Sequence, residues 1–210
     1  GDGYRLTNAG ADLARRMRVF VNKAWPYGEA NPDHEFLALN YRTTELASAV
    51  GRAQLAKLAD GVDRRIAAAD RLTKQLAGVD AIVTPEAAPS DTAVYWRYAL
   101  HVDPEHLPGG PDALAAALRE VEVPSAPRYI QKPAFRCKVI ADQRTFGDSR
   151  WPFTLARPEA VDYAEERFPG TFAYLSSVLV LPWNERFTDD HVDHLAGALT
   201  GAVAELNREA

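Results

Sequence analysis

The chain has 210 residues, of which 47% are hydrophobic and 25% charged, the ordinary balance of a globular protein. Its 24 basic and 29 acidic side chains give a net charge of −5, which argues against non-specific nucleic-acid binding because such binding needs a basic face. No apolar run approaches the roughly 20 residues that cross a bilayer, so we expect no membrane association. The single cysteine, Cys137, excludes an internal disulfide framework, and we expect a cytoplasmic location.

The N-terminal region contains a predicted turn, a helix and a loop. Residues 1–7 (GDGYRLT) read as a turn that enters a strand, and this start without methionine leads us to expect a fragment of a longer protein. Apolar residues recur at helical spacing over residues 11–25 and predict a helix that Pro26 ends. Residues 26–35 form a loop by composition.

A long helix is predicted from about Thr44 to about Leu76. Gly61 lies inside its apolar pattern and indicates a bend or a junction. Helices of this length often connect two domains. We therefore divide the chain into residues 1–77 and 78–210.

The C-terminal part predicts a small α+β domain that covers one side of a sheet. Alternating or buried apolar runs predict strands over residues 81–85, 94–102 and 178–181, with an extended segment over 124–130. Apolar periodicity predicts helices over residues 111–120, 161–168 and 172–177, and a last helix that starts at an N-cap, Thr188. Residues 131–153 predict a long functional loop, and Trp96 is expected in the core.

Two histidines on the last predicted helix raise the question of a metal site. His191 and His194 are three residues apart, beside Asp190 and Asp193, and such spacing can hold a metal. The same helix needs a solvated face opposite Val192, and these four residues lie on it. We therefore favour the solvated face and predict no metal site.

Asn40 and Arg42 form a candidate anion site just before the long helix. Two residues apart in an extended segment, they point the same way. The arginine offers a planar fork of donors that suits phosphate oxygens, the asparagine adds a neutral donor, and the helix start adds partial positive charge. The alternative is a capping arrangement in which both residues only fix a loop.

A second candidate site lies in the proline-bounded segment 127–135 (PRYIQKPAF). Arg128, Tyr129 and Lys132 place two cations and a phenol within this short stretch. Such a set can bind a polyhydroxylated or phosphorylated ligand. The alternative is a surface loop with ordinary charges.

Taken together, these segments resemble the DegT/DnrJ/StrS family of sugar aminotransferases, a branch of the fold type I enzymes that use pyridoxal 5′-phosphate (PLP). Residues 1–3 (GDG) are similar to the family's Gly-Glu-Gly-Gly turn, and residues 39–46 (LNYRTTEL) to its Gly-Tyr-Asn-Tyr-Arg-Met-Ser-Glu-Leu stretch. Residues 178–182 (VLVLP) and 188–192 (TDDHV) match the family's closing strand and helix. The resemblance covers essentially the whole chain, and residues 39–46 are its most specific part.

The resemblance implies an α/β fold of the fold type I PLP-transferase class. Residues 1–77 would be the end of the large PLP-binding domain with the long connecting helix, and residues 78–210 the small C-terminal α+β domain. It also implies a homodimer with shared active sites. Asn40 and Arg42 would bind the PLP phosphate of the neighbouring subunit.

The implied activity is transfer of an amino group from an amino acid, usually glutamate, to a keto-sugar or related cyclic ketone. Arg128, Tyr129 and Lys132 would help to form the substrate pocket. The Schiff-base lysine of the family is expected just upstream of Gly1, so we expect this chain alone to be inactive.

The sequence departs from the family pattern at two positions of the glycine turn, and the absence of the Schiff-base lysine keeps other functions open. Asp2 replaces the usual glutamate, and Tyr4 replaces the second glycine of the pair. In some relatives a histidine replaces the lysine, and the chemistry becomes sugar dehydration. The other alternative is a non-catalytic module for dimerisation and substrate covering.

Overall fold

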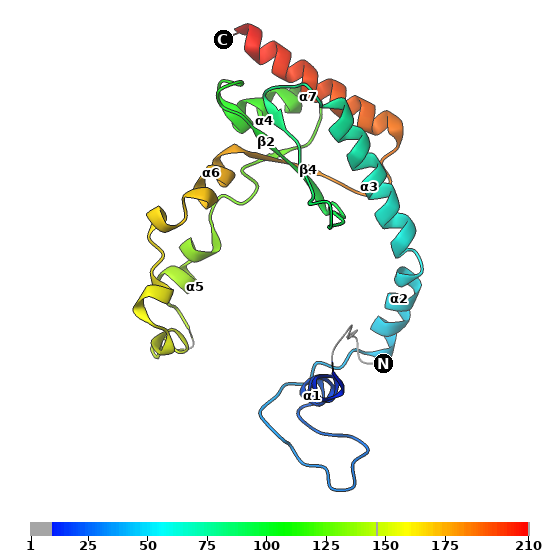
Figure 1. The fold of residues 1–210 in the computed structure, drawn as a ribbon, viewed down its shortest axis with the longest axis vertical. Coiled ribbons are helices and arrows are strands. Elements are labelled where there is room, and N and C mark those ends of the chain that lie inside the picture. The colour runs from blue at the N-terminus through cyan, green and yellow to red at the C-terminus, as the bar shows by residue number, and fades with distance from the viewer. Residues whose placement is uncertain (1–9, 146, 210) are drawn as a thin grey trace. The chain divides into compact units, whose positions relative to one another are not determined.

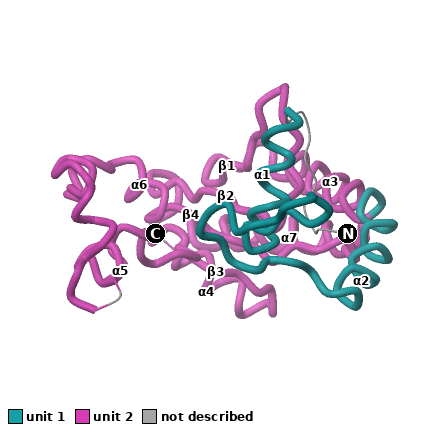
Figure 2. The backbone as a smooth tube through the Cα atoms, turned by 90° about the horizontal axis from the view of Figure 1, so that it is seen from below, with its two compact units in different colours: residues 1–60 teal, residues 61–210 magenta. Residues whose placement is uncertain are grey.

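The computed structural model describes residues 10–145 and 147–209 (Figure 1). The turn predicted at residues 1–7 lies outside these described residues. The chain divides into two compact units, unit 1 with residues 1–60 and unit 2 with residues 61–210 (Figure 2). The domain boundary predicted between residues 77 and 78 stays a prediction, because compactness alone does not define a domain.

In the described residues of unit 1, a long loop joins helix α1 (Ala11–Val21) to helix α2 (Glu45–Leu55). The helix predicted over residues 11–25 ends four residues early. Lys23 and Ala24 adopt left-handed backbone, with φ of +65° and +58°, which a continuing α-helix does not allow. Helix α2 starts where expected, because the Thr44 hydroxyl accepts a hydrogen bond from the backbone N–H of Ala47 at 3.1 Å.

The single helix predicted over residues 44–76 is two helices, α2 and α3 (Leu58–Gln75). The break lies at Ala56 and Lys57 and not at Gly61, which is an ordinary helical residue of α3. The backbone N–H of Lys57 bonds to the carbonyl of Gln54 at 3.0 Å, three residues back, so the α-helical pattern is interrupted there.

Unit 2 is built on a four-stranded antiparallel sheet in the order β1-β2-β4-β3. The strands are β1 (Ile82–Val83), β2 (Arg97–Val102), β3 (Ala126–Pro127) and β4 (Val178–Pro182). Helix α3, helix α4 (Gly110–Glu120) and helix α7 (Asp189–Glu209) pack next to this sheet (Figure 1). The order of strands and helices agrees with the order that the sequence predicts.

The period-two alternation of β2 sets which side chains enter the core. Tyr98 lies opposite Leu181 and Leu100 lies opposite Leu179, and all four are fully buried against the helices. Arg97 and the other alternate residues of β2 are half-buried on the opposite face. The sheet therefore presents Arg97 away from the hydrophobic core.

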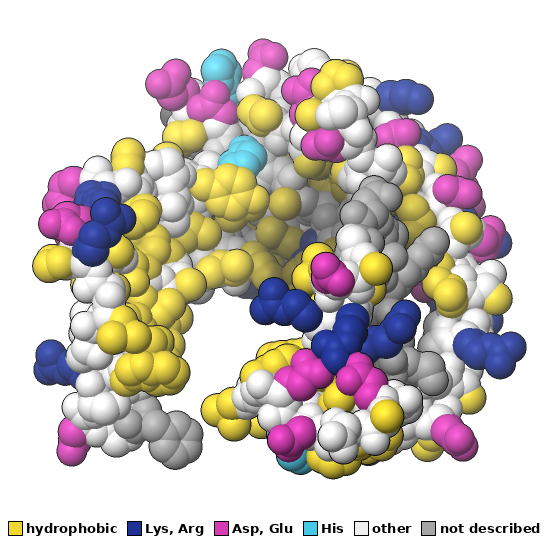
Figure 3. Space-filling model, turned by 60° about the horizontal axis from the view of Figure 1, so that its bottom comes forward, with side chains coloured by type: hydrophobic (Ala, Val, Ile, Leu, Met, Phe, Trp, Pro, Cys, Tyr) yellow, Lys and Arg dark blue, Asp and Glu magenta, His cyan; other side chains and the backbone are white. Residues whose placement is uncertain are grey.

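The segment between β3 and β4 forms an arm, residues 131–177, and short helices interrupt the long loop predicted over residues 131–153. The short helices of the arm are η1 (Ala134–Arg136), α5 (Lys138–Ala141), η2 (Phe153–Leu155), η3 (Pro158–Val161), η4 (Glu165–Arg167) and α6 (Pro169–Ser177). Hydrophobic side chains line this arm, on the left of Figure 3. Phe135 stacks on Phe168 at 4.5 Å between ring centroids and holds its two halves together.

The prediction of a helix over residues 161–168 is wrong, because this segment contains the end of η3 and the short η4. The carboxylate of Asp162 accepts a hydrogen bond from the backbone N–H of Ala164, which favours a turn at this position. The guanidinium of Arg167 then donates to the carbonyls of Glu159 and Asp162, both at 2.8 Å. These bonds stabilise two separate 3₁₀ turns in place of a helix.

Candidate functional site

Backbone bonds in unit 1 fix the segment that carries Asn40 and Arg42. The N–H of Tyr41 donates to the carbonyl of Val21 at 2.9 Å, and the N–H of Lys23 donates to the carbonyl of Leu39 at 3.2 Å. Asn40 also forms an isolated antiparallel bridge with the residue that ends α1. The extended segment is thus paired with the end of α1, just before α2 begins.

The side chains of Asn40 and Arg42 contact each other. Oδ1 of Asn40 accepts hydrogen bonds from the backbone N–H and from Nε of Arg42, each at 3.3 Å. The Arg42 guanidinium also lies 5.8 Å from the ring centroid of Tyr27, within range of a cation–π contact. Both side chains are exposed. The sequence therefore identified two residues that the structure does bring together.

The bonded atoms leave a set of donors free. Oδ1 is the acceptor of Asn40, so its amide nitrogen still has two hydrogens to donate. The terminal nitrogens of Arg42 make no hydrogen bond within the described ranges. An oxyanion binds to hydrogen-bond donors that are not already paired with an acceptor, and the amide nitrogen of Asn40 and the terminal nitrogens of Arg42 are such donors.

The capping alternative for this pair is only partly correct. Thr44, and not Asn40 or Arg42, caps α2. The contact of Asn40 with the backbone of Arg42 does fix the local turn. The pair therefore stabilises its own segment and still presents donors outward.

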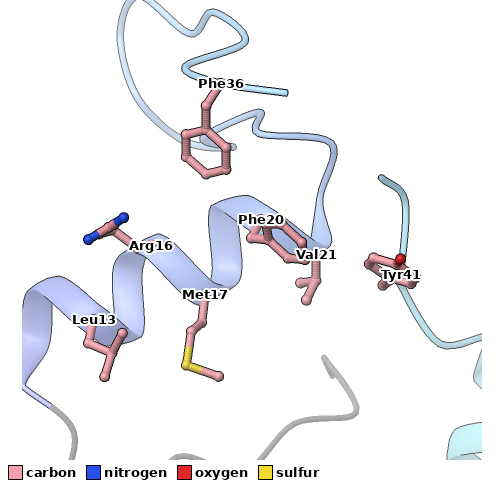
Figure 4. Close-up of a pocket in the computed structure, with 7 residues that line it drawn as sticks. All are labelled: Leu13, Arg16, Met17, Phe20, Val21, Phe36 and Tyr41. Atoms are coloured by element: carbon pink, nitrogen blue, oxygen red, sulfur yellow. The ribbon is translucent and has the colours of Figure 1, made fainter. Parts of the chain in front are cut away.

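A pocket of about 600 Å³ lies on the apolar side of α1 (Figure 4). Its lining residues are Leu13, Arg16, Met17, Phe20, Val21, Phe36 and Tyr41. Phe20 stacks with Phe36 and Tyr41, at 6.4 and 5.9 Å between ring centroids. Among the lining residues that the structure describes, Arg16 carries the one charge, and the others are apolar or aromatic.

In unit 2 the structure places Arg128, Tyr129 and Lys132 together on an exposed turn. The N–H of Arg128 donates to the carbonyl of Val178 at 2.7 Å, which ties the turn to β4. Nη2 of Arg128 lies 3.2 Å from the carboxylate of Asp112 on α4, so an acidic side chain already neutralises this cation. Tyr129 is 40% exposed, and Lys132 is exposed as well.

The expectation that Trp96 lies in the core is wrong, because its side chain is 69% exposed. The strand begins at Arg97 and not at Val94, and Tyr95 adopts a left-handed φ of +48°. This turn interrupts the alternation that would put Trp96 on the same face as the buried Tyr98.

Trp96 instead forms an aromatic corner around Arg97. The Arg97 guanidinium carbon lies 4.9 Å from the ring centroids of both Trp96 and Tyr129. The two rings meet edge to face at 74°, with 6.3 Å between their centroids. Sequence reasoning missed Arg97, although its alternation with Tyr98 already places it opposite the core.

Arg65 on α3 holds the backbone of this corner. Its guanidinium donates to the carbonyls of Tyr95 at 3.3 Å, Trp96 at 3.2 Å and Trp183 at 2.9 Å. It also pairs with Glu185 at 2.7 Å. One partly buried cation therefore fixes the backbone before β2 and after β4.

The histidines of α7 make local contacts. Nδ1 of His191 lies 2.7 Å from the hydroxyl of Thr188, and Asp193 binds Arg71 and Gln75 of α3. Within the described ranges, no group of three or more His, Cys, Asp or Glu side chains is arranged to hold a metal. None of the helices described is both long and apolar enough to span a bilayer.

Comparison with known proteins defines the class of this fold. Residues 1–200 match the model of the DegT/DnrJ/EryC1/StrS aminotransferase family, so the chain belongs to that family. A search of curated proteins found no match.

Solved structures share the fold at low sequence identity. An aminotransferase from Psychrobacter cryohalolentis superposes with a TM-score of 0.70 at 19% identity, over 96% of this chain and 51% of that one. DesV from S. venezuelae, solved with a ketimine intermediate, gives 0.68 at 21% identity, over 92% and 45%. A DegT/DnrJ/EryC1/StrS aminotransferase from Brucella abortus gives 0.66 at 22%, over 91% and 44%. The chain thus spans about half the length of the structures it matches.

Proposed function

We propose that the protein takes part in PLP-dependent transfer of an amino group from an amino acid, most simply glutamate, to a keto-sugar or related cyclic ketone. Membership of an aminotransferase family supports amino transfer. The observation that carries the proposal is the donor pair Asn40 and Arg42 on a fixed segment just before α2.

The donor set of this segment fits the phosphate group of PLP. A phosphate ester is a dianion with several acceptor oxygens, and it binds best to a cationic fork supplemented by neutral donors. Arg42 supplies the fork, and the amide of Asn40 supplies the neutral donor. Their mutual bond holds both side chains in place before the ligand arrives, which lowers the entropy cost of binding.

PLP, when bound, supplies the electron sink that amino transfer requires. In our proposal this chain's own residues bind and orient. Asn40 and Arg42 hold the phosphate end of the cofactor, and Tyr129 and Lys132 donate hydrogen bonds to the hydroxyl groups of the ketone. Arg128 remains paired with Asp112 and shapes the turn.

We further propose a homodimer in which Asn40 and Arg42 of one subunit serve the cofactor of the other. Helix α2 supports this proposal, because none of its residues is buried within the chain. Leu46 and Val50, four residues apart on one side of α2, are 78% and 55% exposed. Such a stripe is typical of a helix that packs against another surface.

The test is cofactor uptake and turnover by the full-length protein. We expect it to bind PLP and, with glutamate and a keto-sugar, to release 2-oxoglutarate. Failure of the purified full-length protein to take up PLP would contradict the proposal.

A further inference from the structure

Arg97 carries a charge that no acidic side chain neutralises in the described part of the chain. Its Nε is buried and makes no hydrogen bond there. The turn that supplies Tyr129, residues 127–133 (PRYIQKP), contains two cations and no acidic residue. A partly desolvated cation without an acidic partner is costly, and a bound anion offsets that cost.

The two rings of the aromatic corner do not enclose the guanidinium of Arg97. The centroids of Trp96 and Tyr129 are 6.3 Å apart, less than twice their 4.9 Å distance to Arg97, so the rings do not sandwich it. They cover two adjacent sides. Because aromatic walls exclude water, a hydrogen bond to the remaining side is stronger than one at an open surface.

The corner is also held in place. Arg97 lies opposite Pro182 at the end of β2, and Arg65 bonds to the carbonyl of the preceding residue, Trp96. Binding sites supported by strands and hydrogen-bonded backbone keep their geometry better than free loops. The guanidinium is therefore presented by a fixed frame.

We propose that Arg97 binds an oxyanion of the substrate, either a carboxylate or a phosphate, and so determines which substrates are accepted. This inference rests on the proposed function, in which the turn with Tyr129 and Lys132 forms part of the substrate pocket. A planar fork of donors matches two oxygens of either anion. The carboxylate would come from the amino donor and the phosphate from the ketone.

The test measures binding of two probes to the full-length protein by calorimetry, D-glucose 1-phosphate for the phosphate source and glutarate for the carboxylate source. We expect one probe to bind, and Arg97→Gln to weaken that probe at least tenfold. Arg97→Lys should weaken it less, because lysine keeps the charge but loses the fork. Arg119→Lys, at an exposed position of α4, is the matched control and should bind like the wild type.

Unchanged affinity in Arg97→Gln, or no binding of either probe to the wild type, would overturn the inference. Thermal unfolding shows whether each variant is folded. If Arg97→Gln does not fold, Arg97→Lys decides, and wild-type affinity in that variant also overturns the inference. PLP uptake by the same samples separates the two proposals, because a wild type that binds a probe through Arg97 but takes up no PLP contradicts only the proposed function.

Discussion

At the residue scale, the role of Asn40 and Arg42 depends on which of their polar atoms are already bonded. Oδ1 of Asn40 accepts hydrogen bonds from Arg42, so the amide nitrogen is the polar atom of Asn40 that can still donate to a ligand. The same contact orients the guanidinium. The pair is therefore a built donor site and not two independent surface residues.

Replacing Arg42 by alanine should weaken PLP binding by about 1.5–3 kcal/mol, the scale of a hydrogen bond to a charged group. That loss corresponds to a factor of about 10 to 150 in Kd. Pyridoxal lacks the phosphate, so its affinity should stay the same. Absorbance titration of the full-length protein with both compounds measures this difference, with Arg52→Ala as the control. Equal weakening of PLP and pyridoxal would remove Arg42 from the phosphate site.

Arg65→Met should destabilise the protein by roughly 2–3 kcal/mol, because three backbone carbonyls lose their donor. Glu185→Gln, which removes only the exposed partner of the ion pair, should cost much less. Denaturant unfolding of both variants tests this contrast. Equal losses would mean that the ion pair, and not the carbonyl bonds, makes Arg65 important.

Single residues also show what sequence alone could predict. Asn40 and Arg42 could be predicted as a pair because residues two apart in an extended segment lie on the same side of the backbone. Trp96 was misplaced because the left-handed backbone of Tyr95 breaks an alternation that the sequence displays without interruption. The residue type at position 95 does not predict this turn, since tyrosine rarely adopts a positive φ.

At the element scale, α3 and α7 are joined by a charged contact. Arg71 donates two bonds to Asp193, at 2.8 and 2.7 Å, and Gln75 donates a third at 2.6 Å. These bonds, led by those from Arg71, lower the pKa of Asp193 from its ordinary value of 3.8 to about 2. Charged Asp193 is therefore the form that the folded state favours.

The stability of the α3–α7 contact should depend on pH with a defined sign. Because the pKa of Asp193 is depressed in the folded state, its stabilisation is present above about pH 4 and disappears as pH falls towards 2. Asp193→Asn should lower Tm at pH 6, and its difference from the wild type should shrink between pH 4 and pH 2. Glu205→Gln on the same helix is the control. A constant difference across this pH range would contradict the account.

The exposed stripe of α2 makes a prediction about assembly. If the proposed dimer forms through this stripe, Leu46→Glu should convert it to a monomer, because burial of a carboxylate in an apolar contact is costly. Arg52→Glu places the same group on the opposite side of the helix and should leave the dimer intact. Light scattering coupled to size exclusion distinguishes the two, and a dimeric Leu46→Glu protein would exclude α2 from the interface.

Element boundaries were harder to predict than the elements themselves. The last helix was predictable because its N-cap residue and its apolar face both indicate a helix that starts after Thr188. The break between α2 and α3 at Ala56 and Lys57 was not predictable, because no glycine or proline lies there. Residues 131–153 of the arm were predicted as a loop because the aromatic stacking of the arm, such as Phe135 on Phe168, joins residues far apart in sequence. Such contacts leave no local period.

At the scale of the whole molecule, the sequence predicted the family and the order of the elements of unit 2. It could not predict the aromatic corner, because Arg97 and Tyr129 meet only when β2 and β3 both pair with β4.

The most direct test of the central claim is a crystal structure of the full-length protein with PLP. We expect Asn40 and Arg42 of one subunit to lie within hydrogen-bond distance of the phosphate bound in its partner. A bound phosphate held entirely by other residues, with these two side chains directed to solvent, would contradict the account.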